Sequence, residues 1–260
     1  MVIESDSKKK AKAQSGGWAE TVRTVIYAVL IALGIRTVAY EPFNIPSESM
    51  LPTLLVGDYL FVAKFSYGYS RHALPLSLPV FSGRILAREP ERGDVAVFKL
   101  PRDNSTDYIK RIIGLPGDRI QMRGGVLYLN GQPVRRQRVE DFVRRGRFGQ
   151  VERIPQFEET LPNGKRYRTL DLRTGSDTDD TRELVVPAGH YFAMGDNRDN
   201  SVDSRIPMQD GGVGFVPLVN LVGRAEFLFF STDGSAQLWE VWNWFGATRF
   251  ERLFRAVDRA

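Results

Sequence analysis

The stretch Asp107-Tyr108-Ile109-Lys110-Arg111-Ile112-Ile113-Gly114-Leu115-Pro116-Gly117-Asp118 sets the pattern for the body of this chain. β-Branched and aromatic residues run from Tyr108 to Ile113, and Pro116-Gly117-Asp118 then supplies a turn. Short runs of this kind, bounded by glycine and proline, predict strands rather than helices. Similar runs recur at Tyr59–Phe65, Asp94–Leu100, Val126–Leu129, Leu184–Pro187, Tyr191–Met194 and Leu221–Phe230, and Asn130-Gly131 is a hairpin turn signal. We therefore predict a mainly β fold after residue 40.

Lys110 stands out within the first of these strands. Side chains alternate between the two faces of a strand, so Tyr108 and Ile112 flank Lys110 on its own face. Burial between apolar neighbours disfavours an ammonium ion and can lower a lysine pKa from ~10.4 by about 3–5 units. Lys110 would then be a usable general base near neutral pH. The alternative is a surface lysine whose aliphatic stem covers the sheet.

Composition limits the chemistry that is available. The 260 residues include no cysteine, which excludes a disulfide scaffold, a thiol nucleophile and any cysteine-ligated metal site. Only His72 and His190 are present, which excludes an imidazole-rich metal centre, and neither sits in a Ser-His-Asp pattern. We assign both histidines structural roles and predict no metal and no cofactor. A hydrolase built from this chain would use a base other than histidine.

The eight lysines divide into two groups. Four lie in the first twelve residues, and only Lys64, Lys99, Lys110 and Lys165 lie beyond, where 28 arginines carry the positive charge. Residues 1–17 are predicted to be a disordered cytoplasmic leader. Residues 18–40 follow, with an uncharged centre from Thr24 to Ile35, and are predicted to be a transmembrane anchor. The positive-inside rule puts everything after residue 40 outside the cytoplasm. A cleaved secretory signal and an amphipathic surface helix are the alternatives.

The body divides by composition. We predict a catalytic β core over residues 41–131 and 184–232, with a polar subdomain inserted over residues 132–183. The insertion is rich in arginine, which could indicate nucleic-acid binding. We favour a solvated surface, because an exported domain rarely meets nucleic acid. Residues 233–260 hold Trp239, Trp242 and Trp244 beside arginines, which suits either a membrane interface or a segment that caps the sheet.

Two polar segments complete the set of candidate functional motifs. Asn44–Leu54 places Ser47 and Ser49 between two prolines, which makes a rigid loop close to the predicted anchor. Gly195–Arg205 is too polar for a strand and is predicted to be a hydrogen-bonded turn with Asp–Arg pairs that fixes neighbouring loops. A calcium loop is disfavoured, because its sixth and twelfth positions are Val202 and Met208.

Taken together, an anchor followed by P-S-x-S-M-x-P-T-L, then Y-I-K-R-x-x-G-x-P-G-D, then G-D-N-R-D-N-S-x-D-S-R resembles the bacterial type I signal peptidases of the Gram-negative kind with a single anchor. The resemblance runs from about Trp18 to Glu226. It implies an all-β catalytic core with an inserted β subdomain. It also implies a serine endopeptidase of the plasma membrane that removes signal peptides from exported preproteins at Ala-x-Ala sites.

The resemblance assigns roles residue by residue. Ser49 matches the nucleophile and Lys110 the general base. Ser47, with the backbone N–H of Ser49, matches the oxyanion hole. Ser201 matches the serine that hydrogen-bonds and orients the lysine, and Asp203 and Arg205 match its supporting pair. Phe43, Ile45, Pro46, Leu54, Tyr108 and Ile109 match positions that line the substrate pockets.

Glu48 is a departure from the family, since Gram-negative members usually have glycine between the two serines. A carboxylate in contact with Lys110 would raise the lysine pKa and weaken the base. We therefore predict that Glu48 points away from Lys110.

The predicted partners are exported preproteins and the lipid bilayer, with no nucleic acid, and we expect a monomer. Two rival functions remain. A membrane-tethered β binding module would not need Ser49 beside Lys110. A self-cleaving repressor with a Ser/Lys pair would need a DNA-binding helical domain in place of the apolar anchor.

Overall fold

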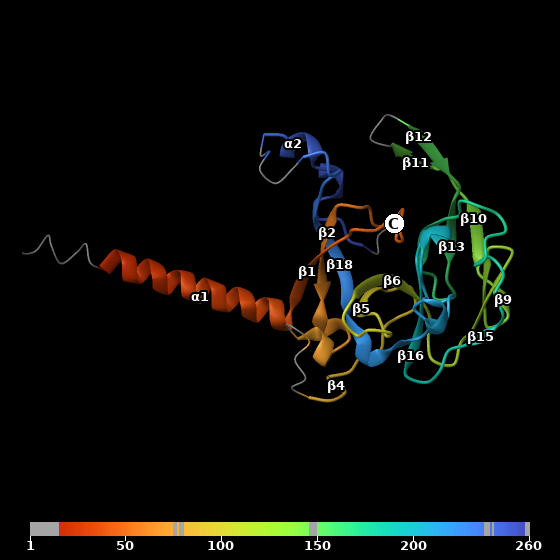
Figure 1. Ribbon diagram of the computed structural model, residues 1–260, viewed down its shortest axis with the longest axis horizontal. Helices are drawn as coiled ribbons and strands as arrows, with labels where there is room; N and C mark the ends of the chain where they lie inside the picture. Colours follow the sequence, from red (N-terminus) through yellow and green to blue (C-terminus); the bar gives the residue numbers. More distant parts are fainter. Residues whose placement is uncertain are drawn as a thin grey trace, which may run out of the picture.

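The computed structural model describes residues 16–74, 77, 81–145, 150–236, 240 and 242–257. Across these residues one long helix, α1 (Gly16–Val38), precedes a body that consists mainly of short strands (Figure 1). The predicted fold class is confirmed. The predicted leader, residues 1–17, lies almost entirely outside the described residues.

Helix α1 extends away from the strands (Figure 1). Residues Gly17–Val38 have a mean hydropathy of 1.6 in their most apolar window, and none of that window is buried by the rest of the protein. Its 23 residues span about 34 Å at 1.5 Å per residue, enough for ~30 Å of hydrocarbon. The helix ends two residues earlier than predicted, because Tyr40 already belongs to the first strand, which contains Pro42.

A seven-stranded antiparallel sheet forms one half of the body. Its order is β1 (Tyr40–Asn44), β2 (Asp58–Ala63), β18 (Leu221–Ser231), β5 (Val95–Lys99), β6 (Asp107–Gly114), β16 (His190–Met194) and β17 (Val216–Pro217). Apolar side chains from β2, β5 and β18 pack with Ile45, Met50 and Leu54 of the loop after β1 in one buried cluster. The loop that carries the two serines is therefore anchored in the core.

A second group of sheets lies beside the first (Figure 1). One sheet has the order β15 (Leu184–Val185), β7 (Arg119–Arg123), β8 (Val126–Leu129) and β9 (Gln132–Pro133), and another has the order β10 (Arg135–Arg138), β13 (Gln156–Thr160) and β14 (Arg166–Leu170). Strands β11 (Phe142–Arg145) and β12 (Val151–Ile154) pair as a projecting hairpin. The short strands β3 (Tyr69–Ser70) and β4 (Arg84–Ile85) pair with each other beside β18 of the seven-stranded sheet. The insertion boundary predicted at residue 132 falls inside the first of these sheets.

The turn between β8 and β9 follows the sequence expectation. Leu129 pairs with Gln132, so Asn130 and Gly131 form a two-residue loop. Their φ angles of 53° and 80° are those of a type I′ turn, which suits Asn-Gly.

The C-terminal segment returns to the main sheet. Arg252 is buried and contacts Asp58 of β2, while Val257 joins the core. Trp242, Phe245 and Phe254 remain 73%, 80% and 77% exposed. Trp239 lies outside the described residues.

Candidate active site

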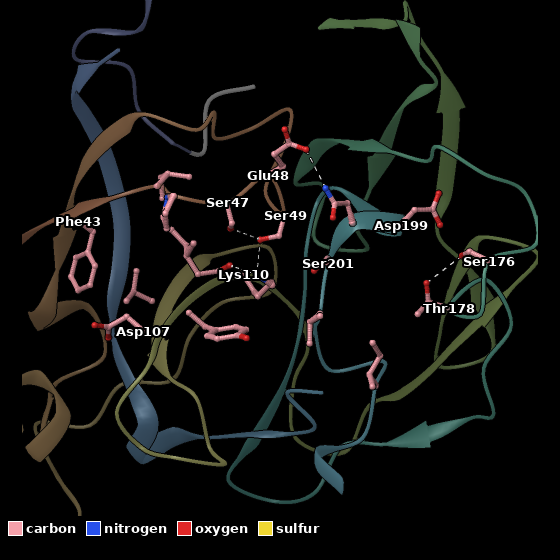
Figure 2. Close-up of a pocket in the computed structure, with 18 of the residues that line it drawn as sticks. Phe43, Ser47, Glu48, Ser49, Asp107, Lys110, Ser176, Thr178, Asp199 and Ser201 are labelled. Atoms are coloured by element: carbon pink, nitrogen blue, oxygen red, sulfur yellow. Dashed lines mark hydrogen bonds between the residues drawn. The ribbon is translucent and has the colours of Figure 1, made fainter. Parts of the chain in front are cut away.

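Ser49 and Lys110 meet although they are 61 positions apart in the sequence. Lys110 Nζ lies 2.7 Å from Ser49 Oγ and 2.9 Å from the carbonyl oxygen of Ile109. Both side chains are buried, with relative exposures of 8% for Ser49 and 4% for Lys110. The serine loop, held by its apolar residues, and strand β6 thus bring a hydroxyl and an amine into hydrogen-bond contact (Figure 2).

The surroundings of Lys110 favour the neutral amine. Burial lowers the pKa of Lys110 to about 8, even though Asp203 and Asp196 act in the opposite direction. Asp203 is paired with Arg205 and Asp196 with Arg111, and Lys110 makes no ion pair within the described part of the chain. An amine with a pKa near 8 is substantially deprotonated in mildly alkaline solution, which is what a general base requires.

A cleft of about 780 Å³ opens over this pair. Ser47, whose Oγ lies 3.4 Å from Ser49 Oγ, lines it beside the catalytic candidates. One part of the wall is largely apolar and comes from β1, the following loop, β5 and β6, with Phe43, Ile45, Pro46, Val97, Tyr108 and Ile109. The other part is polar and comes from the segment 173–178 and from Asp199, Asn200 and Ser201. Figure 2 shows Phe43 and Ser176 on opposite sides of the Ser49–Lys110 pair.

Leu54 differs from the other predicted substrate-pocket residues. It is fully buried in the core cluster beneath the serine loop and does not line the cleft. The loop turns back into the core after Ser49, with Leu54 N donating to Met50 O at 2.9 Å. Its side chain therefore anchors the loop in this structure.

The segment Gly195–Arg205 fixes the serine loop from the other side. Asn197 donates from its backbone N–H to Ser49 O and from Nδ2 to Glu48 O, both at 3.1 Å. A Cβ added at Gly195 would lie 2.6 Å from Ser49 O and 2.2 Å from Ser201 Oγ, so only glycine fits there. The predicted hydrogen-bonded turn that holds neighbouring loops is confirmed.

The predicted supporting residues lie next to the pair. Asp203 and Arg205 form a buried ion pair at 2.9 Å, and Asp203 also accepts a hydrogen bond from Gly195 N–H at 3.0 Å. Ser201 lines the cleft, but its buried Oγ has no hydrogen-bond partner among the described residues. The hydrogen bond expected from Ser201 to Lys110 is thus not formed in this structure.

Asp196 connects three parts of the site. Arg111 donates to it from Nε at 2.9 Å and from Nη2 at 2.7 Å, and Thr53 Oγ1 donates at 2.6 Å. Strand β6, the serine loop and the Gly195–Arg205 segment are thereby joined on the face of β6 opposite Lys110. The sequence indicated Asp–Arg pairs within the segment, but this partner lies 85 residues away.

Glu48 points away from Lys110, as predicted (Figure 2). Its Oε1 accepts from Arg144 Nη1 of the β11–β12 hairpin at 2.5 Å, and its Oε2 accepts from Asn200 Nδ2 at 3.2 Å. Sequence reasoning missed Arg144, because no local motif links residue 144 to residue 48.

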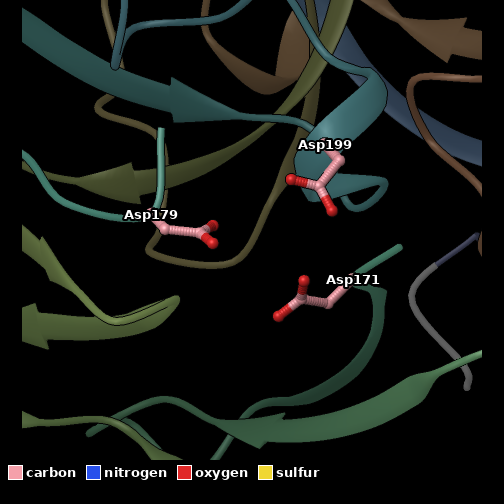
Figure 3. A group of neighbouring side chains, drawn as sticks. All are labelled: Asp171, Asp179 and Asp199. Carbon is pink, nitrogen blue, oxygen red and sulfur yellow. The ribbon is translucent and has the colours of Figure 1, made fainter. Parts of the chain in front are cut away.

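Asp199 of the polar wall lies close to two further carboxylates, Asp171 and Asp179 (Figure 3), with ligand oxygens within 4.8 Å of one another. This is the acidic group among the described residues that could hold a cation. Each carboxylate already has partners: Asp179 accepts from Gly175 and Ser176 N–H, Asp199 from Leu172 and Arg173 N–H, and Asp171 from Arg136. Burial raises the pKa of Asp171. These contacts shape the segment that forms the polar wall.

This chain is similar to known proteins of one family. A family model described as signal peptidase, peptidase S26, matches residues 18–230. Signal peptidase I of Rickettsia conorii is 39% identical over 269 residues, covering 97% of this chain and 95% of that protein. Signal peptidase I of Rickettsia typhi is 44% identical over 214 residues, covering 79% and 78%. A crystal structure of a signal peptidase I from Enterococcus faecalis V583 has 26% sequence identity and covers 53% of this chain and 97% of its own; its TM-score of 0.31 is too low to bear on the fold.

Proposed function

Because the chain belongs to the signal peptidase family, peptidase S26, we propose that it is a membrane-bound serine endopeptidase with a Ser/Lys dyad. It removes N-terminal signal peptides from exported preproteins after a small residue, at sites of the Ala-x-Ala type. The observation that carries this proposal is the buried contact of 2.7 Å between Lys110 Nζ and Ser49 Oγ.

The first step is acylation of Ser49. Neutral Lys110 takes the Ser49 hydroxyl proton as the oxygen attacks the scissile carbonyl carbon. The negative charge moves to the carbonyl oxygen, where the Ser47 hydroxyl and the Ser49 backbone N–H stabilise it. Protonated Lys110 then gives its proton to the leaving amine, and the mature protein departs.

The second step releases the signal peptide. Lys110 is neutral again and takes a proton from a water molecule that attacks the acyl-enzyme carbon. The tetrahedral intermediate collapses, the Ser49 oxygen leaves and is reprotonated by Lys110, and the signal peptide departs as a free acid. The same amine therefore serves as base and acid in both halves of the reaction.

The cleft supports binding of an extended substrate. Strand β16 pairs with β6 from Arg111 to Gly114, so no described strand pairs with the Asp107–Lys110 end of β6 on the side opposite β5. A substrate strand can add to this edge through main-chain hydrogen bonds. The apolar wall with Phe43, Ile45 and Ile109 then receives the small residues before the cleavage point, and the polar wall faces the residues after it.

The length and hydropathy of helix α1 support its assignment as a single-pass anchor in the plasma membrane. The lysine-rich sequence before it favours a cytoplasmic N-terminus, which puts the catalytic body on the outer side of the membrane, where exported precursors emerge. The exposed Trp242, Phe245 and Phe254 suit contact with the membrane surface. We propose that the enzyme acts there as a monomer.

A cleavage assay with Ser49→Ala tests the proposal. The detergent-solubilised full chain is incubated with a preprotein that carries an Ala-x-Ala site, and the products are identified by mass spectrometry. The wild type is expected to cut after the second alanine, and the variant to lose essentially all activity, because alanine offers no nucleophile. Equal cleavage by both proteins would refute the dyad. No cleavage by the wild type would favour a binding module.

A further inference from the structure

We propose that Arg144 is a positioning residue for the Ser49–Lys110 pair: it holds the Glu48 carboxylate on the hairpin side of the serine loop and so keeps Lys110 free of a carboxylate partner. This inference rests on the proposed function, since it concerns the same base. It assigns the projecting β11–β12 hairpin of the inserted sheets a part in the chemistry of the core.

Glu48 sits directly between the two functional serines. Asn197 Nδ2 holds its backbone carbonyl at 3.1 Å, so the main chain of the loop is fixed and the side chain alone decides where the charge lies. Arg144 Nη1 and Asn200 Nδ2 take one carboxylate oxygen each. Figure 2 shows the resulting direction, with the carboxylate turned away from the Lys110 amine.

Arg144 is held in place by a second carboxylate, that of Glu152. It lies opposite Glu152 in the register of β11 and β12, and Glu152 Oε2 accepts from its Nε at 3.0 Å and its Nη2 at 2.6 Å. That leaves Nη1 directed at Glu48. Two of the three guanidinium nitrogens fix the arginine in the hairpin, and the third acts on the serine loop.

The other charged groups around Lys110 have partners of their own. From the Gly195–Arg205 segment, Asp196 is paired with Arg111 and Asp203 with Arg205; on β6 itself, Asp107 is paired with Lys99. The direct hydrogen-bond partners of Nζ are the Ser49 hydroxyl at 2.7 Å and the Ile109 carbonyl oxygen at 2.9 Å, and the centroid of the Tyr108 ring lies 5.2 Å away. Glu48 differs from these carboxylates because its counter-ion comes from the hairpin rather than from the catalytic core.

Loss of Arg144 should therefore act on Lys110 through Glu48. A carboxylate released from the hairpin can turn toward the amine, and an opposite charge within about 4–6 Å favours the ammonium form. Activity needs the neutral amine, so kcat/KM rises as pH increases through the pKa of Lys110, near 8 in the wild type. A raised pKa moves this rise to higher pH by about 0.5–1 unit, which lowers activity at neutral pH about three- to tenfold and leaves the alkaline plateau nearly unchanged.

The experiment measures kcat/KM for preprotein cleavage from neutral to strongly alkaline pH with the solubilised full chain. R144Q is expected to show the shifted profile, and the double variant E48Q/R144Q to regain the wild-type profile, because it no longer has the carboxylate. Arg153→Gln is the matched control, since Arg153 is exposed on the opposite face of the same hairpin and should leave the profile unchanged. E152Q keeps Arg144 but removes the carboxylate that holds it. This variant should shift the pH profile in the same direction as R144Q, but by less.

The outcomes separate the possibilities. A loss in R144Q that is equal at every pH, or that E48Q does not reverse, would indicate a merely structural role and overturn the inference. If R144Q does not fold, E152Q decides: a profile identical to the wild type counts against the proposal. Absence of cleavage by the wild type at any pH would instead contradict the proposed function.

Discussion

Lys64 and Lys110 are both buried lysines close to the seven-stranded sheet, with relative exposures of 1% and 4%. Lys64, just after β2 and close to the end of α1, forms an ion pair with Glu41 at 2.8 Å. Lys110, in the cleft, contacts a serine hydroxyl and a backbone carbonyl. Both side chains are nearly inaccessible to solvent, but their partners differ: Lys64 has a carboxylate counter-ion, whereas the direct partners of Lys110 are neutral and burial lowers the pKa of its amine. The comparison teaches that burial alone does not make a lysine a base.

The largest expected effect is the loss of activity in Lys110→Arg. A guanidinium cannot give up its proton in a protein, so the variant has no base, although it keeps the positive charge. Cleavage should fall on the order of 10⁴–10⁶-fold. The matched variant Lys64→Arg, which keeps an ion-pairing cation opposite Glu41, should retain most activity. Comparable activity in both variants would show that the two lysines are not functionally distinct.

Glu41→Gln should have the next largest effect, on stability rather than on catalysis. It leaves the buried Lys64 ammonium without its counter-ion, which typically costs about 3–5 kcal/mol of unfolding free energy. Chemical denaturation of the solubilised chain measures this cost. Glu183→Gln is the control, because Glu183 and its partner Arg119 are 34% and 59% exposed and solvent already screens that pair. A midpoint in Glu41→Gln no lower than in the control would contradict the role of Glu41.

A smaller effect is expected from Ser47→Ala, which changes the Lys110 environment without changing any charge. If Ser47 donates to the oxyanion, kcat should fall about 10²–10³-fold while KM changes little. The rise of activity with pH should stay near pH 8, since burial of the lysine sets it. Single-turnover cleavage across pH separates the two effects. A shift of the profile with no loss on the alkaline plateau would assign Ser47 to the base instead.

Much of the fold could be predicted because its signals are local. Strand runs, the Asn130-Gly131 turn and the apolar stretch before Tyr40 each depend on neighbouring residues, and β2, β5, β6, β8, β16 and β18 all lie within about two residues of the predicted runs. The grouping of strands into sheets was less predictable. Strands β7 and β8 pair with β9 and β15, although composition assigned β7, β8 and β15 to the core and only β9 to the insertion.

The candidate site shows the same division. Motif resemblance located Ser47, Ser49 and Lys110, which the structure places within one cleft. It also indicated Leu54 as a pocket residue and Ser201 as a hydrogen-bond partner of Lys110; in the structure Leu54 lies in the core and Ser201 Oγ is without a partner among the described residues. Whether a side chain faces the cleft or the core depends on how the loop folds back. The spacing of residues within a motif does not predict that path.

The sequence alone determined the class of protein and the available chemistry. It contains no cysteine, two histidines and only four lysines after the leader, so the base of a serine hydrolase had few candidates. Tertiary structure distinguishes one of these four, which is the lysine that we propose as the base. Lys64, Lys99 and Lys165 lie opposite Glu41, Asp107 and Asp94, whereas Lys110 lies opposite Ser49. A lysine becomes a base through burial without a counter-ion, and both burial and partners arise only when distant segments of the chain pack together.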